Sequence, residues 1–310
     1  MGLKYLLIIF ILSPLHLYSQ EVKVRKTEKI NIPKDGTWAL SAAAPDGRSL
    51  LITGENMKGL HLLLLKKSTL TTISDAPGSG YEPVFTPDGK KIYYRSDEYR
   101  NSRKYSSLEE YEVLSARKRQ VEAPARVLVS PALSGTSLNY MIEGKRRHID
   151  SGTGESIKGA EGVYLLLEDL VPVLYVNGRR KELRPNGAGN YIWASLSPDQ
   201  SKILYNFGGT LTCIADTSGN ILRELGRLNA PEWISNNLIV AMNDVDDGHR
   251  VISSDICCYS LVSDKLYNLT RSDDIIEMYP LPLSKRNIIA CQTSEGELFL
   301  IHYRIRKHVK

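Results

Sequence analysis

Three short turns of similar sequence organise this chain. They are Pro45-Asp46-Gly47, Pro87-Asp88-Gly89 and Pro198-Asp199-Gln200, and each lies between two β-rich runs. Proline pre-sets φ, aspartate accepts backbone hydrogen bonds and glycine tolerates positive φ, so each tripeptide favours a tight turn. The first two turns begin 42 residues apart, at Pro45 and Pro87. A fixed period in this range predicts an array of small sheets, and the β-propeller is built in this way.

The second repeat shows the unit most clearly. Its β-rich runs cover residues 81–86, 91–95, 108–114 and 119–123. Such runs are short, β-branched or aromatic, and bounded by turns, which favours strands over helices. Counting these units predicts an all-β propeller of four-stranded antiparallel blades, with seven blades favoured. The third and fourth units are short, and the third has a degenerate turn at residues 132–135. They could together form one irregular blade, so six blades is the alternative.

The ends of the propeller are predicted to meet. The last unit contains three strand-like runs within residues 278–303, whereas residues 22–32 are β-like and precede the first repeat. A propeller closes when one terminus completes the blade begun by the other. We therefore expect residues 21–34 to supply the outer strand of the last blade, and residues 35–310 to form one propeller domain.

Residues 1–20 are typical of a secretory signal peptide. Lys4 is basic, the run from Leu6 to Leu12 is apolar, and Ser19 is a small residue near the end. The apolar run is shorter than the roughly 20 residues that span a bilayer. An uncleaved anchor is the alternative. We expect cleavage, no transmembrane segment, and a location in the periplasm or outside the cell.

The turns and their flanking strands resemble the TolB-like propeller repeats of exported bacterial proteins, also called WD40-like or PD40 repeats. The matching segments are residues 44–50, 86–92, 197–203 and 246–256. The resemblance implies a propeller that acts as a binding scaffold, and it supplies no catalytic residues. TolB also carries an N-terminal α/β domain, for which the short stretch before residue 35 leaves no room.

The charge of the chain is only mildly basic. The formal net charge is +5, and the basic clusters are spread over separate repeats. Dedicated nucleic-acid binding usually shows a concentrated basic stripe, so we do not expect it here. The clusters fit solvated loops and strand edges. A shared surface for an anionic partner is the alternative.

Four cysteines, Cys213, Cys257, Cys258 and Cys291, lie in β-rich runs and match no zinc-binding spacing. Adjacent residues of a strand point to opposite faces, so Cys257 and Cys258 cannot both face one partner. We expect buried free thiols. One disulfide is the alternative, because export to an oxidising compartment permits it.

The densest polar cluster contains Asp244, Asp246, Asp247 and His249. Carboxylate oxygens are the ligands that Ca²⁺ prefers, but the order of an EF-hand loop is not met. An Asp/Gly-rich turn between strands is the simpler interpretation. No metal or other cofactor is expected, with Ca²⁺ as the alternative. If the turn lies at the mouth of the ring, these residues are candidates for contact with a ligand or partner.

Aromatic residues recur at the start of the first strand of a blade, at Tyr81, Trp193, Trp233 and Tyr279. The first strand of a propeller blade lines the central channel, so these side chains are candidates for ligand or partner binding at its mouth. Packing between blades is the alternative for each.

Two functional classes remain. The first is a non-catalytic, monomeric propeller of the cell envelope that binds an envelope protein or peptide through the loops of one rim. The second is a propeller enzyme acting on a saccharide, as a lyase or glycosidase. Two carboxylates facing each other in the channel would favour the second class. No nucleophile motif or catalytic triad is recognised, so no catalytic residues are expected.

Overall fold

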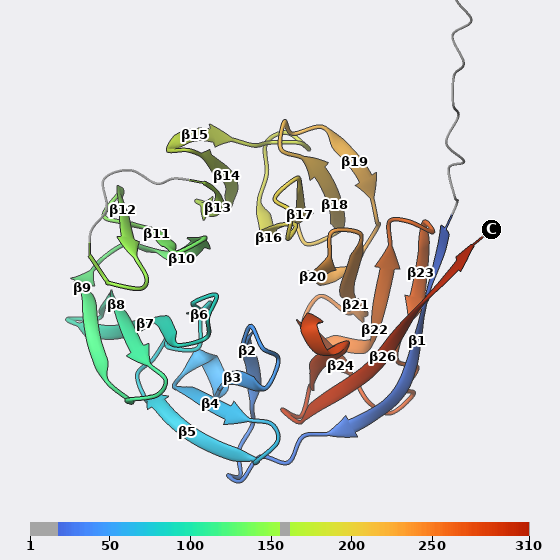
Figure 1. Ribbon diagram of the computed structural model, residues 1–310, viewed down its shortest axis with the longest axis horizontal. Coiled ribbons are helices and arrows are strands. Elements are labelled where there is room, and N and C mark those ends of the chain that lie inside the picture. The colour runs from blue at the N-terminus through green and yellow to red at the C-terminus, as the bar shows by residue number, and fades with distance from the viewer. Residues whose placement is uncertain (1–17, 156–161, 310) are drawn as a thin grey trace, which may run out of the picture.

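The computed structural model describes residues 18–155 and 162–309, whose strands form seven antiparallel sheets arranged as blades around a central axis (Figure 1). The predicted all-β propeller with seven blades is therefore confirmed. In chain order the strands are β1 (Tyr18–Lys29), β2 (Ala39–Ala43), β3 (Ser49–Thr53), β4 (Leu60–Leu64), β5 (Thr69–Ser74), β6 (Val84–Phe85), β7 (Lys91–Arg100), β8 (Arg103–Glu112), β9 (Lys118–Ala125), β10 (Leu128–Ser134), β11 (Ser137–Ile142), β12 (Lys145–Asp150), β13 (Val163–Glu168), β14 (Val171–Val176), β15 (Arg179–Glu182), β16 (Tyr191–Leu196), β17 (Lys202–Phe207), β18 (Leu211–Asp216), β19 (Ile221–Glu224), β20 (Asn229–Ser235), β21 (Leu238–Asp246), β22 (Val251–Ser260), β23 (Lys265–Asn268), β24 (Glu277–Leu283), β25 (Ile288–Thr293) and β26 (Leu298–Val309).

The blades follow the chain in order, with the first strand of each blade innermost (Figure 1). Five blades have four strands. The third blade, β10-β11-β12, and the fourth, β13-β14-β15, have three strands each in the described residues. These are the two short units of the sequence, and they form two separate blades rather than one irregular blade.

The ring is closed by its N-terminal strand, as the sequence predicts. β1 pairs antiparallel with β26 and completes the seventh blade in the order β24-β25-β26-β1. Val22 of β1 is buried with Ile301 and Tyr303 of β26. The predicted signal peptide lies largely outside the described residues, and β1 begins at Tyr18, slightly before the predicted closing segment.

The repeated turns connect the two inner strands of their blades, and their hydrogen bonds explain the motif. The Oδ1 atom of Asp88 accepts hydrogen bonds from the Lys90 amide at 3.1 Å and from Thr86 Oγ1 at 2.6 Å. Gly89 adopts a φ of 71°, which is the left-handed conformation that glycine favours. The motif is therefore a folding device.

Bulges interrupt the innermost strands. The register shifts within β2, β10, β16, β20 and β24. Proline occupies this point in three of them, as Pro131, Pro231 and Pro280. An innermost strand has a partner on one side only, so a proline there removes no hydrogen bond of the sheet when its nitrogen faces the channel.

Two strand boundaries predicted from the sequence are wrong. The strand expected over residues 81–86 contains only Val84–Phe85, because the chain before it takes a φ of 48° at Glu82 and continues with Pro83. The turn expected at residues 132–135 is shorter, because β10 passes its bulge and continues to Ser134.

The core consists of apolar clusters between adjacent blades. Cys258 and Cys291 belong to one cluster that joins the sixth and seventh blades, whereas Cys257 packs on the opposite face of β22 against Leu228 and Ala241. All four cysteines are buried and unpaired, as expected. Burial raises the pKa of Cys257 to about 12, so this thiol stays protonated and inert.

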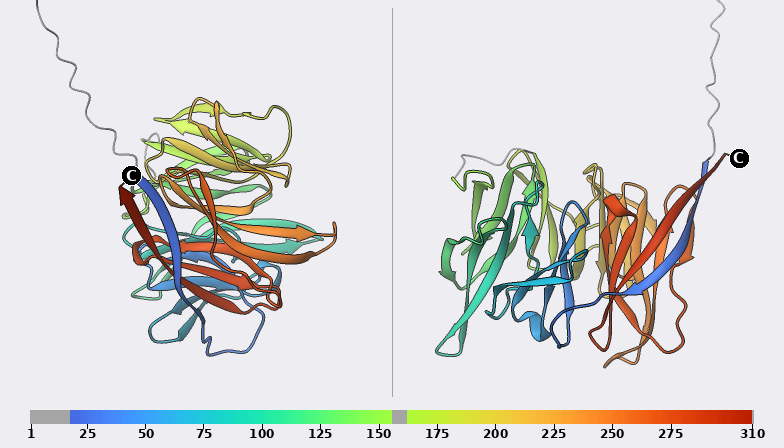
Figure 2. Two further views of the ribbon diagram at one scale, coloured as in Figure 1. Left: turned by 90° about the vertical axis from the view of Figure 1, so that its right-hand side faces the viewer. Right: turned by 60° about the horizontal axis from the view of Figure 1, so that its bottom comes forward.

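The two faces of the ring differ. Two long hairpins, β7–β8 and β21–β22, extend beyond the other strands on one face, which we call the hairpin face (Figure 2). Both hairpins join the second and third strands of their blades, and the innermost strands begin at this same face. The free ends of β1 and β26 extend from the opposite face, where the Pro-Asp-Gly turns also lie (Figure 2).

Ring closure can be tested within one strand. Val22→Ala removes buried apolar volume from the seventh blade, since Val22 is 5% exposed, whereas Val24 on the same strand is 37% exposed. We expect Val22→Ala to lower the free energy of unfolding by about 1.5 kcal/mol. Val24→Ala should change it by less than about 0.5 kcal/mol. Urea titration followed by circular dichroism measures both, and equal effects would contradict the assigned register of β1.

Candidate functional site

The channel opening on the hairpin face is shaped by the bulges of the innermost strands. Glu82, Trp193, Ala230 and Tyr279 have positive φ values of 48°, 50°, 43° and 51°. For bulky residues this conformation costs about 1 kcal/mol or more, and it clusters at functional sites. Trp193 is 37% exposed and Tyr279 is 44% exposed, so burial of these side chains does not fully offset the cost of the backbone strain. The strained backbone instead holds two large aromatic side chains partly in solvent.

The charge of a glutamate in the second blade acts on a glutamate in the sixth blade. Glu82 precedes β6 of the second blade, and Glu232 lies on β20 of the sixth blade. These blades are not adjacent in the ring, and their innermost strands lie on opposite sides of the channel (Figure 1). Burial, and then the charge of Glu82, raise the pKa of Glu232 to about 7. The channel therefore holds a carboxyl group that titrates near neutral pH.

Glu232 is partly accessible to water although protein surrounds it on all sides. Both observations agree with a side chain inside a narrow channel, where solvent enters but screens charge poorly. The sequence analysis did not single out Glu82 or Glu232. The only available signal was an acidic residue next to a proline in an otherwise apolar innermost strand, at Glu82-Pro83 and Pro231-Glu232.

Tyr81 lies beside Glu82 and is exposed. The Arg95 guanidinium lies over its ring, 5.1 Å from the centroid, and Arg95 Nη2 donates a hydrogen bond to the Leu128 carbonyl at 2.6 Å. Burial of the hydroxyl group and the adjacent Glu82 raise the pKa of Tyr81. We call Tyr81, Glu82, Trp193, Glu232 and Tyr279 the channel-mouth residues.

Trp233 has a different role from the other predicted aromatic residues. It is buried in a cluster with Leu204, Ile214 and Ile239, and its Nε1 atom donates a hydrogen bond to the Ser195 carbonyl at 3.4 Å. Trp233 therefore packs between the fifth and sixth blades, which is the alternative that the sequence left open.

The predicted acidic cluster forms the tip of the β21–β22 hairpin. Asp246 Oδ1 accepts a hydrogen bond from the Gly248 amide at 2.9 Å. Asp247 Oδ1 accepts from the amides of His249 and Arg250, which lowers the pKa of Asp247. His249 is exposed. These contacts are those of an Asx-type turn, so the carboxylates hold the shape of the hairpin.

Arginine neutralises the base of this hairpin. Arg227 forms ion pairs with Asp246 and, at 3.7 Å, with Asp244. Asp244 is buried and accepts a hydrogen bond from Asn229 Nδ2 at 2.8 Å. The oxygens that Ca²⁺ would need are thus already engaged. Within residues 18–155 and 162–309, no group of three or more His, Cys, Asp or Glu side chains is arranged to hold a metal ion.

The predicted site residues therefore divide into three groups. Tyr81, Trp193 and Tyr279 lie on the first strands or just before them, near the channel. Asp244, Asp246, Asp247 and His249 lie in the β21–β22 hairpin on the same face, with Asp244 buried, and Trp233 lies in the core.

Among the residues that the structure describes, none belongs to a helix with the length and hydrophobicity of a membrane span.

Solved structures share this fold at low sequence identity. A structure described as the mitotic checkpoint complex contains a chain with a TM-score of 0.62 and 11% identity, covering 97% of both chains. An oligogalacturonate lyase in complex with manganese has a TM-score of 0.58 and 13% identity, covering 93% of this chain and 96% of its own. An oligogalacturonate lyase from Vibrio parahaemolyticus has a TM-score of 0.57 and 11% identity, covering 92% and 96%.

These similarities establish the class of the molecule, a seven-bladed β-propeller. No family model matches the chain. No curated protein sequence matches it either. The fold is thus shared with proteins of unrelated roles, and a function has to be argued from the channel and the hairpin face.

The coupling across the channel can be measured directly. Glu82→Gln removes one negative charge, so the pKa of Glu232 should fall toward the ordinary glutamate value. Carboxyl ¹³C NMR titration follows this group, and Glu224→Gln on the exposed β19 is the matched control. An unchanged Glu232 titration in Glu82→Gln would contradict the coupling.

The free energy of unfolding should also depend on the ionisation of Glu232. The folded-state pKa of Glu232 lies above its value in the unfolded chain, so the stabilising contribution is present at low pH and is lost as the pH rises from about 5 to about 7. Glu232→Gln should flatten this part of the stability profile, measured by urea unfolding at a series of pH values. A profile with the wild-type slope would contradict the raised pKa.

Proposed function

We propose that this chain is a non-catalytic propeller of the cell envelope whose channel mouth binds a basic, extended segment of an envelope protein. The observation that carries this proposal is the raised pKa of Glu232, to which the charge of Glu82 contributes, together with the strained and exposed Trp193 and Tyr279 on other innermost strands. The resemblance to TolB-like repeats and the signal-like N-terminal sequence support a location in the envelope.

The chemistry of the mouth fits a cationic ligand. A Lys or Arg side chain that enters between Glu82 and Glu232 would favour ionisation of Glu232 and relieve the repulsion between the two carboxylates. The faces of Trp193 and Tyr279 attract the same cations, with about 0.5–1 kcal/mol for each exposed cation–π contact. A rigid ring presents these groups without a large ordering cost, which favours binding.

The two long hairpins extend the binding face. The β7–β8 tip carries Arg100 and Arg103, and the β21–β22 tip carries Asp246 and Asp247. They belong to the second and sixth blades, the same two that carry the two glutamates. Both tips carry charges of both signs, since Arg100 pairs with Glu98 at one tip and Arg250 pairs with Asp247 at the other. They would therefore contact a partner of mixed charge that covers the mouth.

The proposal is tested with a fluorescein-labelled hexalysine peptide and fluorescence anisotropy at low ionic strength. We expect the Glu82→Gln/Glu232→Gln double variant to bind at least ten times more weakly, and Trp193→Ala to bind several times more weakly. Leu114→Ala, which changes an exposed apolar residue in the β8–β9 turn, should bind like the wild type. Equal binding by the double variant would refute the channel as the site.

A second candidate function is acid–base chemistry on a saccharide, because burial and the charge of a second carboxylate raise the pKa of Glu232 to about 7, which suits a general acid. Two structural neighbours are oligogalacturonate lyases. Incubation with oligogalacturonate, followed by ultraviolet absorbance of an unsaturated product, tests this function. Activity that Glu232→Gln abolishes would favour the enzyme over the scaffold.

A further inference from the structure

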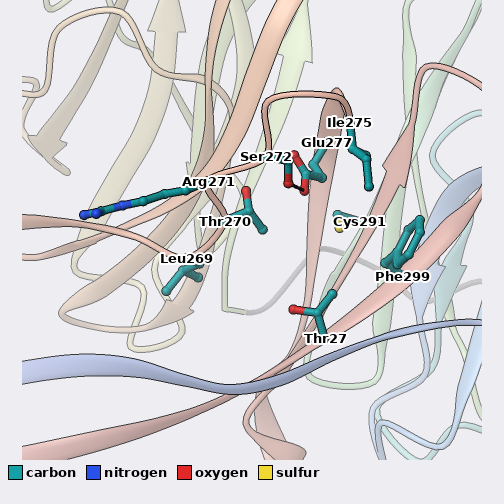
Figure 3. Close-up of a pocket in the computed structure, with 9 residues that line it drawn as sticks. All are labelled: Thr27, Leu269, Thr270, Arg271, Ser272, Ile275, Glu277, Cys291 and Phe299. Atoms are coloured by element: carbon teal, nitrogen blue, oxygen red, sulfur yellow. Dashed lines mark hydrogen bonds between the residues drawn. The ribbon is translucent and has the colours of Figure 1, made fainter.

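A cavity of about 260 Å³ lies between the sixth and seventh blades (Figure 3). Its walls come from the segment that joins the two blades and from β1, β24, β25 and β26. They combine apolar side chains with hydroxyl groups, namely Leu269, Ile275 and Phe299 with Thr27, Thr270 and Ser272. The volume suits a ligand of a few heavy atoms.

One wall of the cavity carries a buried carboxylate that is only half satisfied. Glu277, the first residue of β24, is 6% exposed. Ser272 Oγ donates a hydrogen bond to its Oε1 atom at 2.6 Å. Its Oε2 atom has no hydrogen-bond partner among the described residues. A buried carboxylate oxygen without a partner is costly, so a donor bound beside it would stabilise the site.

A second carboxylate strengthens the negative potential. Asp255 on β22 accepts hydrogen bonds from Thr270 Oγ1 at 3.2 Å and from the Ser272 amide at 3.3 Å. The nearest cation in the wall is Arg271, and its guanidinium group points away from Glu277 in Figure 3. The cavity thus joins an apolar surface to an uncompensated negative group.

We propose that this cavity binds a primary ammonium group carried on a short apolar chain. The ammonium donates to Glu277 Oε2 and neutralises it, and the chain packs on Leu269, Ile275 and Phe299. The group could come from a free small amine or from a lysine side chain of a bound protein, and both present the same chemistry. This proposal does not depend on the function proposed for the channel mouth.

Binding to this cavity has a defined pH dependence. Burial raises the pKa of Glu277, and the charge of Asp255 adds to this effect. Hydrogen bonds from Ser272, from the Glu277 amide and from Thr270 act in the opposite direction. Cys291 of β25 faces the same carboxylate, and its pKa is raised to about 12, so it remains a thiol. Arg271 lines the cavity from the connecting segment, and β1 contributes Thr27, which does not titrate. Affinity for an ammonium group should rise as the pH rises through the pKa of Glu277.

The test is isothermal titration calorimetry of the full chain with n-butylamine, with n-butanol as the uncharged probe of equal length. We expect n-butylamine to bind with an affinity that increases with pH, and n-butanol to bind at least tenfold more weakly. Nα-acetyl-lysine amide is the second probe. Binding of both amines assigns the cavity to a lysine side chain, and binding of n-butylamine alone assigns it to a free amine.

Variants separate binding from folding. Glu277→Gln keeps the size of the side chain and should lose at least tenfold in n-butylamine affinity, whereas Glu297→Gln, exposed in the same blade, should not. If Glu277→Gln does not fold, Ile275→Trp fills the cavity from its rim with Glu277 intact and should also abolish binding. Unchanged n-butylamine affinity in the folded variant, or equal affinity for n-butanol, overturns the proposal.

Discussion

The pairing of β1 with β26 is the contact on which the rest of the ring depends. It joins residues at the two ends of the chain, from Tyr18 opposite Val309 to Lys29 opposite Phe299. Each blade buries its faces only against its neighbours, so the seventh blade must be complete to link the sixth blade to the first. Closure also pairs the outer edge of β26, so that β1 becomes the outermost strand of the seventh blade.

Closure places the innermost strands in an unusual position, since each has a partner on one side and the channel on the other. Backbone hydrogen bonding is therefore required on one edge only, and bulges with proline are tolerated there. The same bulges turn Trp193 and Tyr279 toward solvent. The features that weaken the regularity of the fold are thus those that shape the channel mouth.

Much of the fold could be predicted from the sequence because its signals are local. The Pro-Asp-Gly turns, the blade count and the closing strand follow from short-range preferences repeated at a regular period. The boundaries at residues 81–86 and 132–135 could not, because no local pattern reveals the positive φ of Glu82 or the bulge after which β10 continues to Ser134. Of the candidate site, Trp193 and Tyr279 were recognisable from their place in the repeat. Trp233 has a similar place but packs between blades, since its neighbours Leu204 and Ile239 cover it.

The sequence by itself determined a propeller of seven repeating β units, because turn chemistry and strand patterning act within a single repeat. Only the tertiary structure decided which polar groups meet. Glu82 and Glu232 are 150 residues apart in the chain and share one channel, and Glu277 and Asp255 come together across a blade boundary. These carboxylates come close together only after the ring has closed, and the surrounding protein then screens their charges poorly. No local sequence pattern could therefore reveal the two pairs.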